Sequence, residues 1–219
     1  MNACFEGPKS SDSSNDSQLI KIQDENTVLG TAEKIALKNG YLNWKNVNEI
    51  AFTFNVDRGE RHFERSWVWK PKTEDIILVS ATDTVAYNRK SMDSIAIKTD
   101  ASFINDKYWL LAPFNLVWDA GLTFSEKEQV IAPISKDTLD QLTIVYANEG
   151  GYTPGDAYDF YFGKDYIIKE WAYRKANDSI PSLITTWEDY ETFNEIKISK
   201  MHKDSTGNWK LFFSNIRVE

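Results

Sequence analysis

The segment EIAFTFNV (49–56), followed by DRGE (57–60) and RHFERSWVWK (61–70), decides the fold of this chain. Apolar and polar side chains alternate in both outer pieces, so that Ile50, Phe52 and Phe54 share one face of the first. Alternation with a period of two is typical of a half-buried strand, and Asp and Gly in the middle piece favour a turn. We therefore predict a β-hairpin over residues 49–70.

The same pattern continues on both sides of this hairpin. Before it, residues 27–40 have apolar residues at helical spacing, and Gly40 supplies a left-handed stop. After it, turns containing Gly, Asn, Asp or Pro separate further expected strands near 76–80, 84–89, 93–98, 139–147, 156–162, 165–174, 183–190, 195–201 and 208–218. Strands joined mostly by short turns pair antiparallel. We predict an α+β, mainly antiparallel protein, a curved half-barrel of about ten strands capped by short helices.

The stretch between the two sets of strands, residues 100–135, has no strand pattern. Residues 103–114 are the most apolar segment of the chain, and they predict a short helix that ends at or before Pro113. The remainder, as far as Pro133, is predicted to be a long loop.

The composition limits the classes of function. The chain has 219 residues, a net charge of -8 and no cluster of Lys and Arg, which argues against nucleic acid as a partner. One cysteine and two histidines give no metal-ligand spacing, so no metal and no cofactor is expected. We expect one domain over residues 26–219, and a monomer.

The N-terminal residues carry a lone cysteine ahead of a polar stretch. Cys4 follows the small residue Ala3, and the sequence up to Ser17 is rich in Ser, Asp and Asn. We predict a flexible tether over residues 1–25, with Cys4 as the lipid-modified cysteine of a bacterial lipoprotein and therefore a membrane anchor. The alternative is an ordinary thiol in a disordered tail.

Three segments carry a resemblance to a known superfamily. They are NDxYWLxAP (105–113), GGxTPGD (150–156) and WxDY (187–190). Together with the order of elements, they resemble the LolA/LolB-like outer-membrane lipoprotein carriers, in an uncharacterised branch of envelope lipoproteins, over residues 26–219. The resemblance implies an incomplete barrel whose apolar cavity receives the acyl chains of a lipid or lipoprotein. It also implies an outer-membrane lipoprotein that faces the periplasm.

Two groups of residues are candidates for contact with such a ligand. On the return strand, Phe63, Arg65, Trp67 and Trp69 share one face, which we interpret as the concave, ligand-facing side, with Arg65 meeting a polar oxygen of the ligand. The alternative is an arginine that stacks on a tryptophan or pairs with a carboxylate on the next strand. The second group belongs to the apolar segment and forms either a mobile lid or a permanent plug: Tyr108, Trp109, Leu111 and Phe114.

Nothing in the sequence indicates a catalytic centre. Asp156 and Asp159 are the nearest approach to a glycosidase carboxylate pair, and neither His62 nor His202 has an evident nucleophile as partner. We therefore predict a binding protein that is not an enzyme. Two alternatives remain open, a carbohydrate-binding module or secreted hydrolase, and a structural envelope domain that binds another protein.

Overall fold

The computed structural model describes residues 28–148 and 154–219. The predicted tether over residues 1–25, with Cys4, lies outside these residues. So do residues 150–153 of the GGxTPGD turn.

Seven strands form the larger of two antiparallel sheets, in the order β10-β11-β12-β1-β2-β3-β4. The predicted hairpin lies at its centre, where Arg58 pairs with Arg61 and Ile50 pairs with Trp69. The strands are β1 (Ile50–Arg58), β2 (Arg61–Lys70), β3 (Asp75–Val79), β4 (Thr84–Asn88), β10 (Glu188–Phe193), β11 (Ile196–Lys203) and β12 (Trp209–Val218). In the middle of this open sheet β1 pairs with β12, so strands that lie far apart in the sequence are neighbours.

The second sheet is a five-stranded meander in the order β5-β6-β7-β8-β9. Its strands are β5 (Leu122–Ile131), β6 (Thr138–Tyr146), β7 (Ala157–Phe162), β8 (Ile168–Arg174) and β9 (Leu183–Thr186). Only Trp187 separates β9 from β10, so the chain passes directly from one sheet into the other. The α+β, mainly antiparallel prediction is confirmed, with twelve strands in the described residues where about ten were expected.

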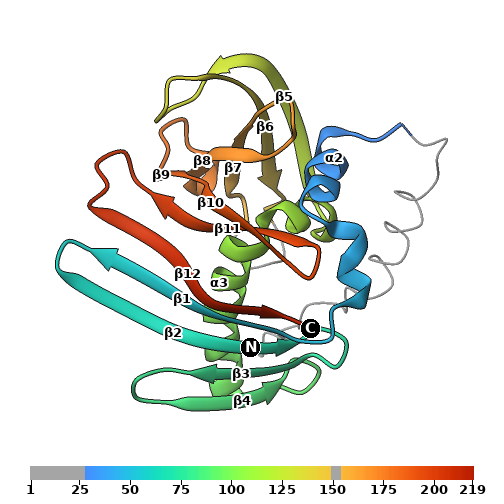
Figure 1. The fold of residues 1–219 in the computed structure, drawn as a ribbon, viewed down its shortest axis with the longest axis vertical. Helices are drawn as coiled ribbons and strands as arrows, with labels where there is room; N and C mark the ends of the chain where they lie inside the picture. The colour runs from blue at the N-terminus through green and yellow to red at the C-terminus, as the bar shows by residue number, and fades with distance from the viewer. Residues whose placement is uncertain (1–27, 149–153) are drawn as a thin grey trace, which may run out of the picture.

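Helices cover the face of the sheets that holds the core. The short helices α2 (Thr31–Lys38) and η1 (Tyr41–Asn46) precede β1, and Gly40 between them has the predicted left-handed conformation, with φ of 90°. The long helix α3 (Ser94–Trp118) runs behind the seven-stranded sheet from the β4 side toward the five-stranded sheet (Figure 1). We call the face of the seven-stranded sheet that α3 covers the inner face.

The start and end of α3 correct two predictions. Residues 93–98 are not a strand, because the Asp93 side chain accepts hydrogen bonds from the backbone N–H groups of Ile95 and Ala96 and so caps a helix. Pro113 does not end the helix either. The chain accommodates it at Leu111, whose φ of -126° and ψ of 26° kink the helix, and burial of the following residues holds the last turns in place.

The predicted long loop after Trp118 is also wrong. Residues 122–131 form β5, which pairs with β6 on both sides of an irregularity between Lys127 and Val130. Most of its side chains are exposed on both faces, so the sequence lacks the alternation that marks a half-buried strand.

One hydrophobic core connects the layers. It contains inner-face side chains such as Phe52 and Trp67, Phe103 from α3, and Phe160 and Trp171 from the five-stranded sheet, each at most 1% exposed. None of the helices in the described residues has the length and apolar content needed to cross a bilayer.

Candidate ligand-binding site

The predicted face of β2 is the inner face. The rings of Trp67 and Trp69 each lie with their centroids 5.4 Å from that of Phe103 on α3, and they are 1% and 6% exposed. Phe63, at the open end of the same strand, is 49% exposed. The inner face of β2 is thus buried under α3 at Trp67 and Trp69 and accessible to solvent at Phe63.

Arg65 lies between these two regions and pairs with a carboxylate. Its Nε and Nη2 donate to the two oxygens of Asp106, at 2.5 and 2.6 Å, and Trp67 Nε1 donates to the same carboxylate at 2.8 Å. Asp106 is fully buried, and burial raises its pKa against the opposing effect of the guanidinium. A carboxylate does pair with Arg65, but it comes from α3 and not from the next strand.

The guanidinium also contacts three aromatic rings. Its centre lies 5.3 Å from the ring of Phe63, 5.4 Å from that of Phe54 and 5.8 Å from that of Trp67. Arg65 therefore holds an ordered position, with 19% of its side chain exposed next to the accessible Phe63. Any role of these residues in contacting a ligand stays a prediction.

The second predicted group does not converge on one surface. Trp109 meets the ring of Trp171 edge-on and that of His202 at a tilt, with ring centroids 4.3 and 5.2 Å away. Tyr108 instead contacts Tyr158 of β7. Phe114 turns toward Tyr41 in η1, 5.4 Å away. Trp109, Leu111 and Phe114 are at most 8% exposed and Tyr108 is half-buried, so the four side chains anchor α3 on several sides.

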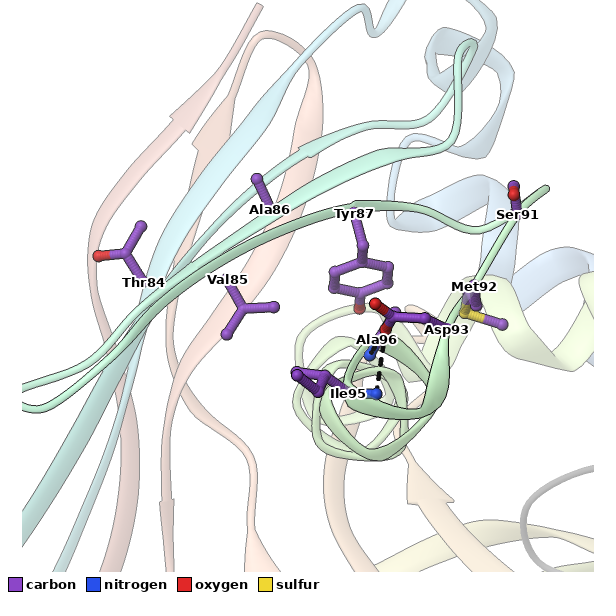
Figure 2. Close-up of a pocket in the computed structure, with 9 residues that line it drawn as sticks. All are labelled: Thr84, Val85, Ala86, Tyr87, Ser91, Met92, Asp93, Ile95 and Ala96. Carbon is purple, nitrogen blue, oxygen red and sulfur yellow. Dashed lines mark hydrogen bonds between the residues drawn. The ribbon is translucent and has the colours of Figure 1, made fainter.

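A hollow of about 630 Å³ lies between β4 and the start of α3. Figure 2 shows Val85 and Tyr87 pointing from β4 toward the helix, whereas Ala86 points to the opposite side of the strand. The hollow is lined by Thr84, Val85, Ala86, Tyr87, Ser91, Met92, Asp93, Ile95 and Ala96. Ile95 is 62% exposed at its rim.

A buried carboxylate fixes the width of this hollow. Asp100 on α3, fully buried, accepts hydrogen bonds from the Tyr87 hydroxyl and from Arg89 Nε, both at 3.0 Å. Arg89 in turn pairs with Glu74, at 3.3 Å. Because Tyr87 and Arg89 lie at the end of β4, these bonds tie the helix to the edge of the sheet.

A second hollow, of about 430 Å³, is lined by Asn48, Glu49, Lys70, Lys72, Thr73 and Glu219. Its charged lining suits an apolar ligand poorly. We therefore take the hollow beside α3, together with the accessible end of the inner face, as the candidate site.

Sequence reasoning missed Val85, Tyr87 and Ile95, which line the candidate site. They were missed because the helix that begins at residue 94 was not predicted. Asp93, a favourable N-cap residue directly ahead of Ser94, could have indicated it. Asp100 and Asp106 were also missed, because an acidic residue within an apolar helix gives no indication of its partner.

The residues considered for catalysis have structural partners. Asp156 accepts hydrogen bonds from Tyr173 and from the backbone N–H of Ala176, and Asp159 pairs with Arg174 at 2.9 Å. Within the described ranges, no group of three or more His, Cys, Asp or Glu side chains is placed to hold a metal ion.

Comparison with known proteins gives a likeness of fold. No protein-family model matches the sequence, and no curated protein sequence matches it. Among solved structures, a DUF1329 family protein from Desulfovibrio piger is similar, with a TM-score of 0.51 and 11% identity over 94% of this chain and 93% of that chain.

Two further structures carry names from the superfamily that the sequence resembles. A LolA superfamily protein from Nitrosomonas europaea has a TM-score of 0.43 at 9% identity, over 87% of this chain and 94% of that chain. A domain named for outer membrane lipoprotein sorting, from Vibrio parahaemolyticus, has a TM-score of 0.45 at 6% identity, over 96% of this chain and 94% of that one. The similarity to the DUF1329 family protein is a similarity of fold.

Proposed function

We propose that this protein binds an acyl chain of a lipid or lipoprotein in the hollow between β4 and α3. The observation that carries the proposal is the hollow itself, at the edge of an otherwise filled inner face, whose lining combines the apolar side chains of Val85, Met92 and Ile95 with polar ones. The polar lining residues are Thr84, Ser91 and Asp93. A volume of about 630 Å³ lies within the range of small-molecule sites.

The energetics favour an aliphatic ligand. Burying one methylene group is worth about 0.8 kcal/mol, so a chain needs no specific polar contact to bind usefully. Phe63 and Arg65, at the accessible end of the inner face, are the predicted site residues that a longer ligand would reach. Trp67, Trp69, Trp109, Leu111 and Phe114 are already packed in the core, and their proposed part is to form the rigid support of the site.

A fluorescent fatty acid, cis-parinaric acid, tests the proposal with purified full-length protein. Ile95→Asp places a charge at the rim of the hollow, where it should weaken binding about tenfold or more because an acyl chain would then contact a carboxylate. The helix should tolerate the change, since an acidic residue in the first turn favours the helix dipole.

Ile131→Asp is the matched control. Ile131 is 63% exposed, against 62% for Ile95, but it lies on β5 in the other sheet. The control should bind the probe as the parent does. A parent protein that binds no fatty acid, or equal losses in the two variants, would contradict the proposed site.

We further propose that the protein acts in the cell envelope, facing the periplasm, and is held at the outer membrane by a lipid on Cys4. The lone cysteine next to Ala3 supports this proposal. Cells that produce the full-length gene product are grown with radiolabelled palmitate, and the protein should carry the label. Cys4→Ser should remove it, whereas an unlabelled parent protein, or a variant that keeps the label, would refute the anchor.

A further inference from the structure

The strand β4 forms one edge of the seven-stranded sheet, and in the part of the chain that the structure describes β3 is its only neighbouring strand. At one end of this pair, the N–H of Ser80 donates to the carbonyl of Asp83 at 2.9 Å. At the other end, the N–H of Arg89 donates to the carbonyl of Glu74 at 3.0 Å. The register between these two contacts has no shift, so every second residue, counted from Asp83, bonds to β3.

The residues between them direct their backbone groups the other way. Thr84 and Ala86 hold their N–H and C=O groups toward the free edge, where these donors and acceptors are in line for an added strand. Both residues are exposed. The available stretch ends at Asn88, whose carbonyl already accepts a hydrogen bond from the N–H of Ser91 at 3.0 Å. The edge of β4 is therefore a short template for strand pairing.

The hollow beside α3 opens along this edge. Val85 and Tyr87 point toward the helix, whereas Ala86 points to the opposite side of the strand (Figure 2). Ala86 nevertheless lines the hollow, which places the backbone of the edge at its wall. The opposite wall is the segment 91–96, which includes the start of α3. A groove between an edge strand and a helix is a geometry in which an extended peptide can add a strand to a sheet.

Other edges of the two sheets carry features that discourage such pairing. β10 has three acidic residues, and β5 has two acidic residues and a lysine beside the irregularity in its register. β9 has four residues and continues through Trp187 into β10. β4, by contrast, has no charged residue, no proline and no shift of register with β3. Its edge is thus open to an uncharged partner strand.

We propose that the free edge of β4 binds an extended, uncharged polypeptide segment as an added antiparallel strand. Such a peptide is a second class of ligand beside the acyl chain of the proposed function. The peptide residues that bond to Thr84 and Ala86 have their side chains on the side to which Ala86 points. The residues between them direct their side chains into the hollow, toward Val85 and Ile95, and their N–H groups away from β4. Small apolar side chains at these alternate positions suit the hollow.

A second copy of the chain is a poorer match than a short peptide. β4 has five residues, which span roughly 17 Å, and its outward backbone groups are those of Thr84 and Ala86. Stable interfaces between two proteins bury about 1,200–2,000 Å². A pair of β4 strands alone is too short to supply that area, whereas a peptide can bind usefully through a single strand.

Fluorescence anisotropy of a fluorescein-labelled peptide of alternating serine and valine tests the inference with full-length protein. The parent should bind this peptide saturably. Because the valines enter the hollow, the serine N–H groups are the ones that face β4. Methylation of the serine amide nitrogens should therefore weaken binding about tenfold or more, whereas methylation of the valine amide nitrogens should weaken it less than about threefold.

Ala86→Pro tests the same hydrogen bonds from the side of the protein. Proline removes the outward N–H of Ala86, which the pairing with β3 does not use, and edge strands tolerate proline at such positions. The variant should bind the peptide about tenfold more weakly or less. Glu126→Pro is the matched control on β5. Because the N–H of Ala147 donates to the carbonyl of Gly121, the same alternation directs the N–H of Glu126 away from β6, and this variant should bind the peptide as the parent does.

Four outcomes would overturn the inference. They are a parent that does not bind the peptide, equal losses with the two methylated peptides, equal losses in the two proline variants, and self-association of the parent that Ala86→Pro abolishes. Sedimentation velocity measures the last, which would mean that β4 pairs with a second copy. The methylated peptides are applied to the parent protein, so they decide the matter even if Ala86→Pro does not fold.

Binding of cis-parinaric acid, measured in parallel, separates this inference from the proposed function. Ala86→Pro keeps the side chains that point into the hollow, so it should bind the fatty acid as the parent does. A parent that binds the fatty acid but not the peptide would refute the inference alone. A parent that binds the peptide but no fatty acid would refute the proposed function alone.

Discussion

The guanidinium of Arg65 on β2 and the carboxylate of Asp106 on α3 form a bidentate pair whose two N–O distances are 2.5 and 2.6 Å. The pair joins residues 41 positions apart in the sequence, and Asp106 has no access to solvent. It fixes the position of α3 on the inner face, midway between the filled core and the accessible end.

Removing one member of this pair should destabilise the protein strongly. Arg65→Met leaves a buried carboxylate without its cationic partner, which we expect to lower the free energy of unfolding by about 3–5 kcal/mol. Urea titration followed by tryptophan fluorescence measures the change. The double variant Arg65→Met with Asp106→Leu removes both charges and should be markedly more stable than Arg65→Met alone. Equal stability of the single and double variants would contradict this account.

His202 should make the protein sensitive to acid. Its ring is fully buried between Trp109, Trp187 and Phe213, and burial lowers its pKa from the ordinary 6.5 to about 3. Below pH 6.5 the histidine binds a proton in the unfolded chain but stays neutral in the folded chain. His202 therefore costs no stability above about pH 6.5. Between that pH and about pH 3, its titration lowers the free energy of unfolding by about 1.4 kcal/mol for each unit that the pH falls.

His202→Asn keeps a donor for the carbonyl of Thr186, which lies 3.3 Å from Nδ1 of the histidine, but it does not titrate. We expect the difference in unfolding free energy between pH 7 and pH 5 to be smaller in this variant than in the parent. His62→Gln, at an exposed position, should not reduce that difference in the same way. An unchanged pH dependence in His202→Asn would show that other groups cause the acid sensitivity.

Gly40 should tolerate no side chain. Its φ is 90°, and a Cβ atom there would lie 2.0 Å from the carbonyl oxygen of Glu195. Gly40→Ala combines the left-handed conformation with a collision against backbone, so we expect a loss of about 2–5 kcal/mol. Gly59 has a φ of 59° and open space around it, and Gly59→Ala should cost only about 1–2 kcal/mol. Urea unfolding of the two variants side by side decides the matter, and similar losses would mean that the contact with Glu195 is relieved easily.

The cap of α3 should contribute measurably to stability. Asp93→Ala leaves the N–H groups of Ile95 and Ala96 without the carboxylate, at a cost of about 1 kcal/mol, which lowers Tm by about 2–4 °C in a chain of this size. Asp93→Asn, whose side chain also caps helices, should recover most of the loss. A Tm in Asp93→Ala equal to that of the parent would argue against the cap.

The central part of the fold could be read from the sequence, because one face of each strand is buried there. Ile50, Phe52 and Phe54 alternate with polar residues, and β1 and β2 form within a residue or two of the predicted bounds. Elsewhere the alternation of apolar and polar residues gave a wrong prediction. The order Ile95, Ala96, Ile97 resembles a strand, although capping by Asp93 makes it a helix.

The candidate site was harder to predict than the fold. Its walls come from β4 and α3, and their separation depends on Asp100 meeting Tyr87 and Arg89, a contact that no sequence pattern announces. Phe63, Arg65, Trp67 and Trp69 do share one face of β2, but burial under α3 removes Trp67 and Trp69 from solvent. Alternation identifies the inner side of a strand but not what covers it.

Trp187 has a mechanical consequence for the molecule. It is the one residue between β9 and β10, its backbone N–H donates to the carbonyl of Lys169, and its indole ring contacts both Trp171 and His202. Separating the two sheets at this point would expose the indole of Trp187, which is 3% exposed, and break its contacts with the surrounding aromatic rings. The junction therefore resists separation of the two sheets at this point, because the indole would lose its contacts with Trp171 and His202.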